Sequence, residues 1–405
     1  MNIATETGKR RSARARAVGP AITSNAIVRA IEVTQSIQSI ENEVRLIADK
    51  ATIMRVYLDP TMVPLGVRLA GEAMWRRDGG GMSYLPSMNR VTFESAAPSL
   101  LDQRFDVGMS LNFTLPAAAI RSGRLELALN RVFVPGGQEI AGAGPLTLSL
   151  RFEAAPIMRV RAIGLRYKRF SDPTVLVSPD AVHFAYMKSY LIRAYPIGAL
   201  DWSQIVIDAD RLRAPFLENA SDIANAQLTI IRTQDVAGGV HPRTHYYGLV
   251  DNDRGAAKCT MQGSAVLDTA TNMFEFVASG PAGRPNGWTG DNDGSFADWY
   301  TAHELGHTFQ RRHPGFPNIP QKEGYQPRDP DDLPGFPYPD GLITSADNRY
   351  VGFDVGDPAL GLPMQAIRGD LHHDFMTYAD DQWVCKYTYD GIYDRLIEEK
   401  RQYGA

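Results

Sequence analysis

The residues best suited to chemistry lie in the segment His303-Glu304-Leu305-Gly306-His307. On a helix, residues four apart share a face, with Cβ atoms roughly 5–6 Å apart. This spacing lets an imidazole nitrogen from each histidine reach one zinc ion at about 2.0–2.1 Å. Glu304 then points sideways and can contact a water on the metal without occupying the metal itself. The segment alone is a weak signal, because such five-residue matches also occur by chance on helix surfaces.

A third histidine strengthens this interpretation. His313 follows His303 by ten residues, where a third ligand arrives if the helix ends after His307 and the chain turns back. Pro314 and Gly315 indicate that the helix has stopped by then. We therefore expect a zinc site formed by His303, His307 and His313. Three neutral histidines leave a fourth zinc position open, which is typical of a catalytic site.

This stretch resembles the metzincin signature HExxHxxGxxH of zinc metalloproteases, and Asp374-Phe375-Met376-Thr377-Tyr378 resembles the Met-turn of that clan. The resemblance implies that Met376 forms an apolar floor beneath the histidines and binds nothing. Tyr378 stands where the Met-turn tyrosine of some branches stands. With zinc, it is expected to hold the oxyanion.

One position departs from the signature. The family pattern implies a glycine between the second and third histidines, and Gln310 stands in its place. If the turn requires positive φ, a non-glycine residue costs on the order of 1 kcal/mol or more. A well-packed domain tolerates that cost, so the substitution fits either a modified turn or a degenerate site.

These residues predict a zinc-dependent endopeptidase that hydrolyses peptide bonds through a zinc-activated water. Glu304 is expected to act as the general base and then to protonate the leaving amine. The alternative is a catalytically decayed zinc-binding effector or binding module, delivered by a secretion or injection machine. Gln310 is the only feature that favours this alternative. Glu304 and Tyr378 favour the enzyme, because a purely structural site needs neither of them.

Residues 26–155 are expected to form an immunoglobulin-like β-sandwich. Short segments alternate apolar with polar residues, and turn signals such as Asp78-Gly79-Gly80-Gly81 separate them. The region also resembles sandwich domains that precede metzincin catalytic domains in bacterial proteins, through Ile31-Glu32-Val33-Thr34-Gln35 and Arg55-Val56-Tyr57. The expected strands cover residues 28–33, 52–57, 67–74, 111–115, 125–129 and 146–152.

Residues 156–405 are expected to form an α+β metzincin-like catalytic domain, so the fold class is multidomain. A helix is expected to begin at Ser178, with Pro179 in its first position, and to end near Ala194. The spacing after Ser221 favours a second helix, although a strand over 228–231 remains an alternative. The other expected elements are strands over 158–167, 244–250 and 273–278 and a helix over 389–403.

The metal-binding helix is expected to start with a capping box, in which Ser295 is the N-cap and Asp298 the acid. After it, ten of the 26 prolines fall between Pro314 and Pro363, so this stretch is expected to be a long ordered surface loop. Three acids in that loop could bind calcium, but a solvated turn is the preferred interpretation; they are Asp329, Asp331 and Asp332.

The remaining histidines are weaker candidates. His372 and His373 could contact the metal ligands or the substrate, but exposed loop positions are the preferred interpretation, and His183 is expected to be structural. The strand over 273–278 is considered as the edge of the cleft on which a peptide adds as a strand. A further group could either line the cleft or pack within the strand; its members are His241, His245, Tyr246 and Tyr247.

The composition sets limits on partners. A chain of 405 residues with 44% apolar and 22% charged residues is typical of soluble globular protein, and a net charge of −4 argues against nucleic acid. No apolar run is long enough to span a membrane. Residues 1–25 read as a disordered basic arm without a signal-peptide core, so a cytoplasmic location or a leaderless export route is expected. The expected partner is a protein or peptide substrate. Cys259 and Cys385 can form at most one internal disulfide.

Overall fold

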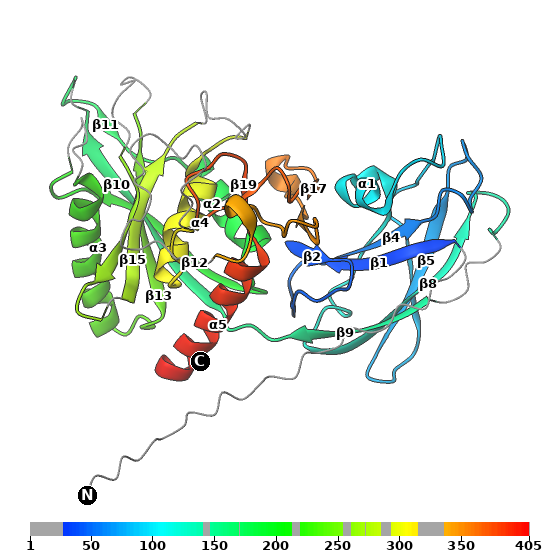
Figure 1. The fold of residues 1–405 in the computed structure, drawn as a ribbon. Helices are drawn as coiled ribbons and strands as arrows, with labels where there is room; N and C mark the ends of the chain where they lie inside the picture. Colours follow the sequence, from blue (N-terminus) through cyan, green and yellow to red (C-terminus); the bar gives the residue numbers. More distant parts are fainter. Residues whose placement is uncertain are drawn as a thin grey trace, which may run out of the picture.

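The computed structural model describes residues 27–140, 146–169, 171–212, 219–253, 261–271, 273–284, 293–314 and 336–404. They form a mixed α/β fold with several sheets and few helices (Figure 1). The predicted basic arm, Cys259 and the three loop acids lie outside the described residues. No described helix is both long and apolar enough to cross a membrane.

Two sheets share one hydrophobic core in the N-terminal region. Every expected strand of this region is present, with bounds that differ by a few residues. The smaller sheet has the order β1 (Val28–Thr34), β4 (Ile53–Leu58), β7 (Leu111–Thr114), and the larger has the order β3 (Leu46–Ile47), β9 (Leu146–Glu153), β8 (Gly123–Phe133), β5 (Ala70–Arg77), β6 (Ser83–Pro86). A helix α1 (Leu100–Phe105) and a 3₁₀ turn η1 (Val107–Met109) connect the two sheets.

A six-stranded sheet forms the centre of the C-terminal region. Its central strand β10 sends Val160 and Ala162 to one core and Ile163 and Leu165 to another, because successive residues of a strand face opposite sides. Most neighbours of β10 run parallel to it. The strands are β11 (Leu176–Val177), β10 (Met158–Lys168), β13 (Thr244–Asp251), β15 (Met273–Ala282) and β14 (Ser264–Asp268), with β12 (Leu200–Asp208) paired to β10.

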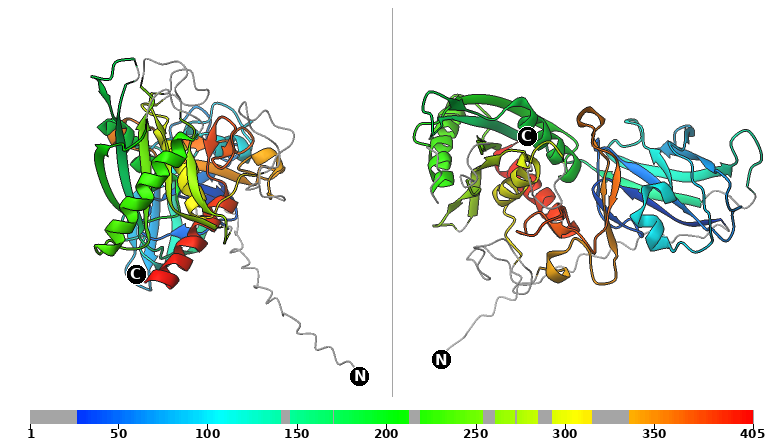
Figure 2. Two further views of the ribbon diagram at one scale, coloured as in Figure 1. Left: turned by 90° about the vertical axis from the view of Figure 1, so that its left-hand side faces the viewer. Right: turned by 90° about the horizontal axis from the view of Figure 1, so that it is seen from above.

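Helices cover both faces of this sheet, as parallel strands require. The helix α3 (Ala220–Ala237) contributes Leu228 to one core, whereas α2 (Ala181–Ala194) and α4 (Ala297–Thr308) contribute Phe184 and Ala302 to the other. The two views of Figure 2 place α3 and α4 on opposite sides of the sheet. The C-terminal helix α5 (Lys386–Tyr403) packs with α2 and α4.

Several local expectations were wrong. The N-cap of α2 is Asp180 rather than Ser178, and its carboxylate accepts the amide hydrogens of Val182 and His183. The N-cap of α4 is Phe296, so the expected capping box at Ser295 does not form. The preferred helix after Ser221 is confirmed as α3, so the alternative strand over 228–231 does not form. The strand β15 lies inside the sheet, and β14 is the edge strand instead.

The proline-rich stretch also contains regular structure where it is described. The strand β16 (Tyr350–Asp354) pairs with β17 (Gln365–Ile367) and with β2 (Ile37–Ser39) from the N-terminal region. The remaining short elements are η2 (Pro339–Gly341), η3 (Pro358–Leu360), β18 (His373–Asp374) and β19 (Gln382–Trp383).

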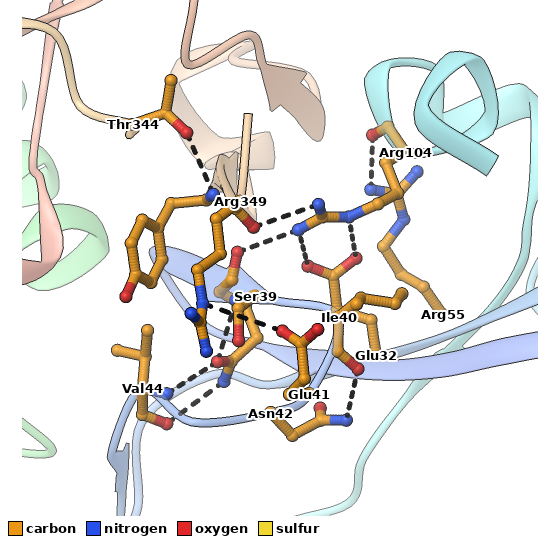
Figure 3. A network of polar contacts seen from close by, with 12 residues as sticks. Glu32, Ser39, Ile40, Glu41, Asn42, Val44, Arg55, Arg104, Thr344 and Arg349 are labelled. Carbon is orange, nitrogen blue, oxygen red and sulfur yellow. Dashed lines mark hydrogen bonds and ion pairs between the residues drawn. The ribbon is translucent and has the colours of Figure 1, made fainter. Parts of the chain in front are cut away.

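The two regions are joined by more than this strand pair. Figure 2 shows the segment with β16 and β17 between them, and Figure 3 shows the polar contacts there. Arg104 donates to the Glu32 carboxylate at 2.9 Å and to the Arg349 carbonyl at 3.1 Å. Lys50 donates to the Arg193 carbonyl at 2.9 Å, which holds the end of α2 against the N-terminal region. The predicted division into domains at residue 155 stays a prediction.

Candidate metal centre

Three histidine side chains meet beside helix α4. His303 and His307 lie on successive turns of the helix, and His313 follows its end. The Nε2 atom of His313 lies 3.0 Å from the Nε2 atom of His303 and 3.0 Å from that of His307. The three side chains are buried. This group could hold a metal ion, as the sequence predicted.

The other ring nitrogens fix which tautomer two of these histidines adopt. The Nδ1 atom of His303 lies 2.7 Å from the Phe375 carbonyl oxygen, and that of His307 lies 2.8 Å from the Arg311 carbonyl oxygen. A carbonyl oxygen only accepts hydrogen bonds, so each Nδ1 atom must carry the proton. In a neutral imidazole the Nε2 atom then carries the lone pair. Such outer contacts are the usual way to orient a metal-binding histidine.

The arrangement fits a metal ion. Ligand nitrogens about 2.0–2.1 Å from one zinc ion, at tetrahedral angles, lie roughly 3.3–3.4 Å from one another. The two 3.0 Å separations at His313 are close to that value. A proton on the Nε2 atom of His313 can serve only one of its two neighbours, whereas a cation between the three rings is attracted to all three lone pairs. Imidazole ligands suit zinc, copper, iron and nickel.

The turn from α4 to His313 uses the residue that departs from the metzincin signature. Gln310 has a φ of +61°, the left-handed conformation that favours glycine. Its amide hydrogen binds the His307 carbonyl oxygen at 2.6 Å, and the amide hydrogen of Arg311 binds the Gly306 carbonyl oxygen at 2.9 Å. These two bonds form a Schellman motif. The same turn presents the Arg311 carbonyl to the Nδ1 atom of His307, so a residue other than glycine still makes the required path.

The segment predicted to be a Met-turn, residues 374–378, packs against α4. A Cβ atom added to Gly306 would lie 2.4 Å from the Sδ atom of Met376, so the methionine occupies the space that the missing side chain leaves. Met376 is completely buried. The carboxylate of Asp374 holds the turn by accepting the amide hydrogens of Met376 at 2.9 Å and Cys385 at 3.0 Å. Burial raises the pKa of Asp374. The strands β18 and β19 pair on either side of the turn.

Tyr378 stands next to the histidines, as the sequence predicted. Its ring centroid lies 5.4 Å from that of His303 and 4.6 Å from that of His313. The side chain is half-buried, so its ring is partly accessible from solvent. Tyr378, one of the two predicted catalytic residues, therefore lies beside two of the three histidines.

Glu304 lies on α4 beside the first histidine and is 4% exposed. Its carboxylate packs against the backbone of Gly263, where an added Cβ atom would lie 2.1 Å from the Glu304 Oε1 atom. The Tyr300 hydroxyl accepts the Gly263 amide hydrogen at 3.0 Å. Burial and the Glu304 charge raise the pKa of Tyr247 well above its usual value. The chain just before the edge strand β14 thus forms one wall of the Glu304 environment.

Other candidate residues lie elsewhere. His245 is buried, with its Nδ1 atom 2.8 Å from the Thr308 hydroxyl and its Nε2 atom 3.3 Å from the Glu399 carboxylate, so it packs in the interior rather than lining a cleft. His183 is also buried, and its Nδ1 atom lies 2.7 Å from the Ser295 hydroxyl, as a structural role requires.

The remaining candidates are also placed. His372 and His373 are half-buried rather than exposed, and both bond to backbone carbonyls through Nδ1. His241 accepts the Arg243 amide hydrogen at 3.2 Å. Tyr246 is buried, and its hydroxyl donates to Asp235 at 2.8 Å, as expected for packing within the strand.

Sequence reasoning missed three residues that shape the site. The absence of a side chain at Gly306 leaves room for Met376, and its absence at Gly263 leaves room for the Glu304 carboxylate. The Asp374 carboxylate accepts hydrogen bonds from the backbone amides of Met376 and Cys385. Gly306 had a local signal, because glycine inside a helix costs about 1 kcal/mol relative to alanine and therefore needs a reason. Gly263 and Asp374 had none, because each acts on a residue that is distant in sequence or on backbone amides.

No protein-family model matches the chain, and no curated protein matches it with significant sequence similarity.

Proposed function

We propose that this protein is a zinc-dependent endopeptidase. The observation that carries the proposal is the convergence of the Nε2 atoms of His303, His307 and His313, with a buried carboxylate, Glu304, on the same helix. Three imidazole ligands leave a coordination position for substrate. When bound, zinc would supply a Lewis acid that acidifies water and polarises a carbonyl group.

Three residues of the chain have separate roles in the proposed reaction. Glu304 takes a proton from the attacking water and delivers it to the leaving amine, because it directly follows His303 on α4 and its buried carboxylate is not one of the three grouped ligands. The Tyr378 hydroxyl donates a hydrogen bond to the carbonyl oxygen as negative charge develops there. Met376 supplies apolar packing beneath the histidines and no chemistry.

The proposed fold assignment follows from the same residues. A helix with two histidines, a Schellman turn that leads to the third and a buried Met-turn segment support a metzincin-like catalytic domain over about 156–405. Two sheets around one core support an immunoglobulin-like sandwich before it. A role of the N-terminal arm in secretion or injection is part of this proposal and rests on its basic sequence alone.

The catalytically decayed effector module is the competing hypothesis, but fewer observations favour it. It depended on Gln310, and that residue adopts the positive φ that the turn requires. The position of Gln310 therefore gives no reason to expect a disrupted third ligand.

The proposal is tested by comparing the zinc-loaded wild type with Glu304→Ala on a proteome-derived peptide library. We expect stoichiometric zinc in both proteins and a cleavage rate lower by about 10²–10⁴-fold in the variant, the usual contribution of a general base. Glu94→Ala, which removes an exposed glutamate, serves as the matched control. Identical fragment profiles for wild type and Glu304→Ala, with zinc bound in both, would refute the peptidase.

A further inference from the structure

A cavity of about 680 Å³ lies beside the metal centre, between α2, the first turn of α4 and the segment after the Met-turn. Two of its lining residues place it there. Trp299 lies four residues before His303, on the same face of α4, and Ala379 directly follows Tyr378. Along α4 the cavity lining thus begins one turn before His303, and along the chain it begins next to Tyr378.

The lining of the cavity is strongly acidic. It contains five carboxylates and one guanidinium group, that of Arg193. Arg193 already has a partner, because it forms a buried ion pair with Asp354. Lys50 lies close to that pair. His372 also lines the cavity, and burial lowers its pKa, so it is neutral near pH 7. The five carboxylates are those of Asp293, Asp298, Asp354, Asp380 and Asp381.

The lining of the cavity stays negatively charged when a proton shared between two of its carboxylates is included. Burial raises the pKa of Asp293, which shares a hydrogen bond with Asp298, so this pair can hold a proton between them. Asp380 and Asp381 are exposed at the rim. Arg193 and Asp354 offset each other as an ion pair, so the other four carboxylates make the cavity lining acidic.

Aromatic rings form much of the remaining wall. Tyr190 and Trp383 pack edge to face, with ring centroids 5.3 Å apart, and Trp299 is a further aromatic residue of the lining. Trp383 is fixed by a hydrogen bond of 2.7 Å from its Nε1 atom to the Ser36 carbonyl oxygen. The guanidinium carbon of Arg193 already lies 5.6 Å from the Tyr190 ring centroid and 5.9 Å from that of Trp383, so this wall is one on which a guanidinium group packs.

We propose that this cavity is a specificity site for a cationic side chain, arginine or lysine, of the peptide substrate. The inference rests on the proposed function for the identity of the ligand as a peptide. The aliphatic stem of such a side chain would lie along the aromatic wall, and its charged end would meet the carboxylates. Guanidinium groups pair with carboxylates through two parallel hydrogen bonds, which favours arginine over lysine.

A bare metal ion fits the cavity less well than a side chain does. A metal site needs ligand atoms that converge on one point. Among the residues that the structure describes, the histidine, cysteine and acidic groups that converge within 4.8 Å are the three histidines and not the cavity acids. The cavity acids instead line a space that is large enough for an extended side chain.

The test compares peptides that are identical except for arginine or its neutral isostere citrulline at single positions. Affinities are measured by calorimetry on the full-length, zinc-loaded Glu304→Gln variant, so that binding does not depend on cleavage. At one position we expect arginine to bind about tenfold tighter than citrulline, as a charged hydrogen bond implies. The preference should fall to about twofold or less when Asp380→Asn and Asp381→Asn are introduced together and should weaken with added salt.

Asp208→Asn, which removes an exposed carboxylate at the end of β12, is the matched control and should keep the full preference. Equal binding of arginine and citrulline peptides at all positions would overturn the inference. A preference that survives both the rim substitutions and Asp298→Asn would also overturn it. If arginine peptides bind selectively but the wild type cleaves none, the cavity assignment stands and the peptidase proposal fails. If the wild type cleaves both peptides equally, the peptidase stands and the cavity assignment fails.

Discussion

Two buried polar clusters, one in each region of the molecule, differ in how their hydrogen-bonding groups are satisfied. In the N-terminal region, the Glu32 carboxylate accepts from Arg104 and from the Tyr57 hydroxyl. Arg55 beside them donates to the backbone carbonyls of Gln103, at 3.1 Å, and Arg104, at 2.8 Å. In this cluster donors face acceptors. Although burial alone would raise the pKa of Glu32, the Arg104 guanidinium holds it below its usual value.

The histidine cluster has the opposite arrangement. The Nε2 atoms of His303 and His307 carry lone pairs, and both point at His313. The three imidazoles each offer one ring nitrogen to a common point, where a single cation would be attracted to all of them. The comparison teaches that burial and polarity by themselves do not identify a site. The two clusters differ in their groups: one pairs a carboxylate with guanidinium and hydroxyl donors, and the other gathers three imidazole nitrogens that could hold a metal ion.

The largest expected effect comes from removing the Glu32 carboxylate from the buried polar cluster of the N-terminal region. Glu32→Ala should lower the free energy of unfolding by about 3–5 kcal/mol, because it leaves the buried Arg104 charge without its partner. Metal stoichiometry at low temperature should not change. Chemical denaturation measures the first quantity and elemental analysis the second. Glu72→Ala removes a partly exposed partner of Arg131 and should cost about 1 kcal/mol or less. Equal losses in the two variants would contradict the comparison.

Removing one of the predicted metal ligands should instead act mainly on the affinity for zinc. His307→Ala should weaken zinc binding by more than about 100-fold, since even the loss of an outer contact to a ligand weakens metal binding by 10–100-fold. Competition with a chelator measures this affinity. His245→Ala is the matched control, because His245 is also buried but bonds to Thr308 and Glu399. The control should lose stability and keep its zinc affinity; a comparable loss of zinc in both would contradict the assignment.

A smaller effect should follow from filling the space above the Met-turn. Gly306→Ala places a methyl group against the Met376 sulfur and should destabilise the protein by about 1–3 kcal/mol, as overpacking does. Thermal unfolding of the apo protein measures this loss. In the double variant Gly306→Ala with Met376→Ala, the two changes should compensate in part. Strict additivity of the two losses would argue against a direct contact.

The smallest effect concerns the turn between the second and third ligands. Gln310→Gly should raise the free energy of unfolding by about 0.5–1 kcal/mol, because glycine adopts positive φ without a steric penalty. Zinc affinity should stay the same. Gln310→Val should have the opposite sign, because a β-branched residue is disfavoured at positive φ. Denaturant titrations of the three proteins give the ranking, and a loss of stability in Gln310→Gly would show that the Gln310 side chain matters more than its backbone.

The sequence predicted the features that depend on local spacing. His303 and His307 share a helix face because four residues make about one turn, and the Met-turn segment was found by its resemblance. The strand alternation of the N-terminal region also reads directly from the sequence. The helix starts were less accurate. Ser178 and Ser295 both precede acids, Asp180 and Asp298, and which residue ends up as the cap depends on the path of the chain before the helix.

Features that join distant segments could not be predicted in the same way. The exposed strand β12 has no clear apolar alternation, since most of its residues face solvent. The fit of Gly306 to Met376 joins residues seventy positions apart. The acidic cavity draws its walls from α2, α4 and the segment around β17 and β19. No periodicity in the sequence marks such a meeting, because it is a property of tertiary packing.

The strand pair β2–β16 has a consequence for how the chain folds. Residues 37–39 bond to residues 350–352, so this pair closes one of the longest loops in the molecule. Chains are synthesised from the N-terminus, and N-terminal units fold first. The strand β2 must therefore wait for its pairing partner until residues 350–352 have left the ribosome. Ser36, next to β2, fixes Trp383 in the wall of the cavity. During synthesis, that wall can form only after a segment more than 340 residues beyond Ser36 has been made.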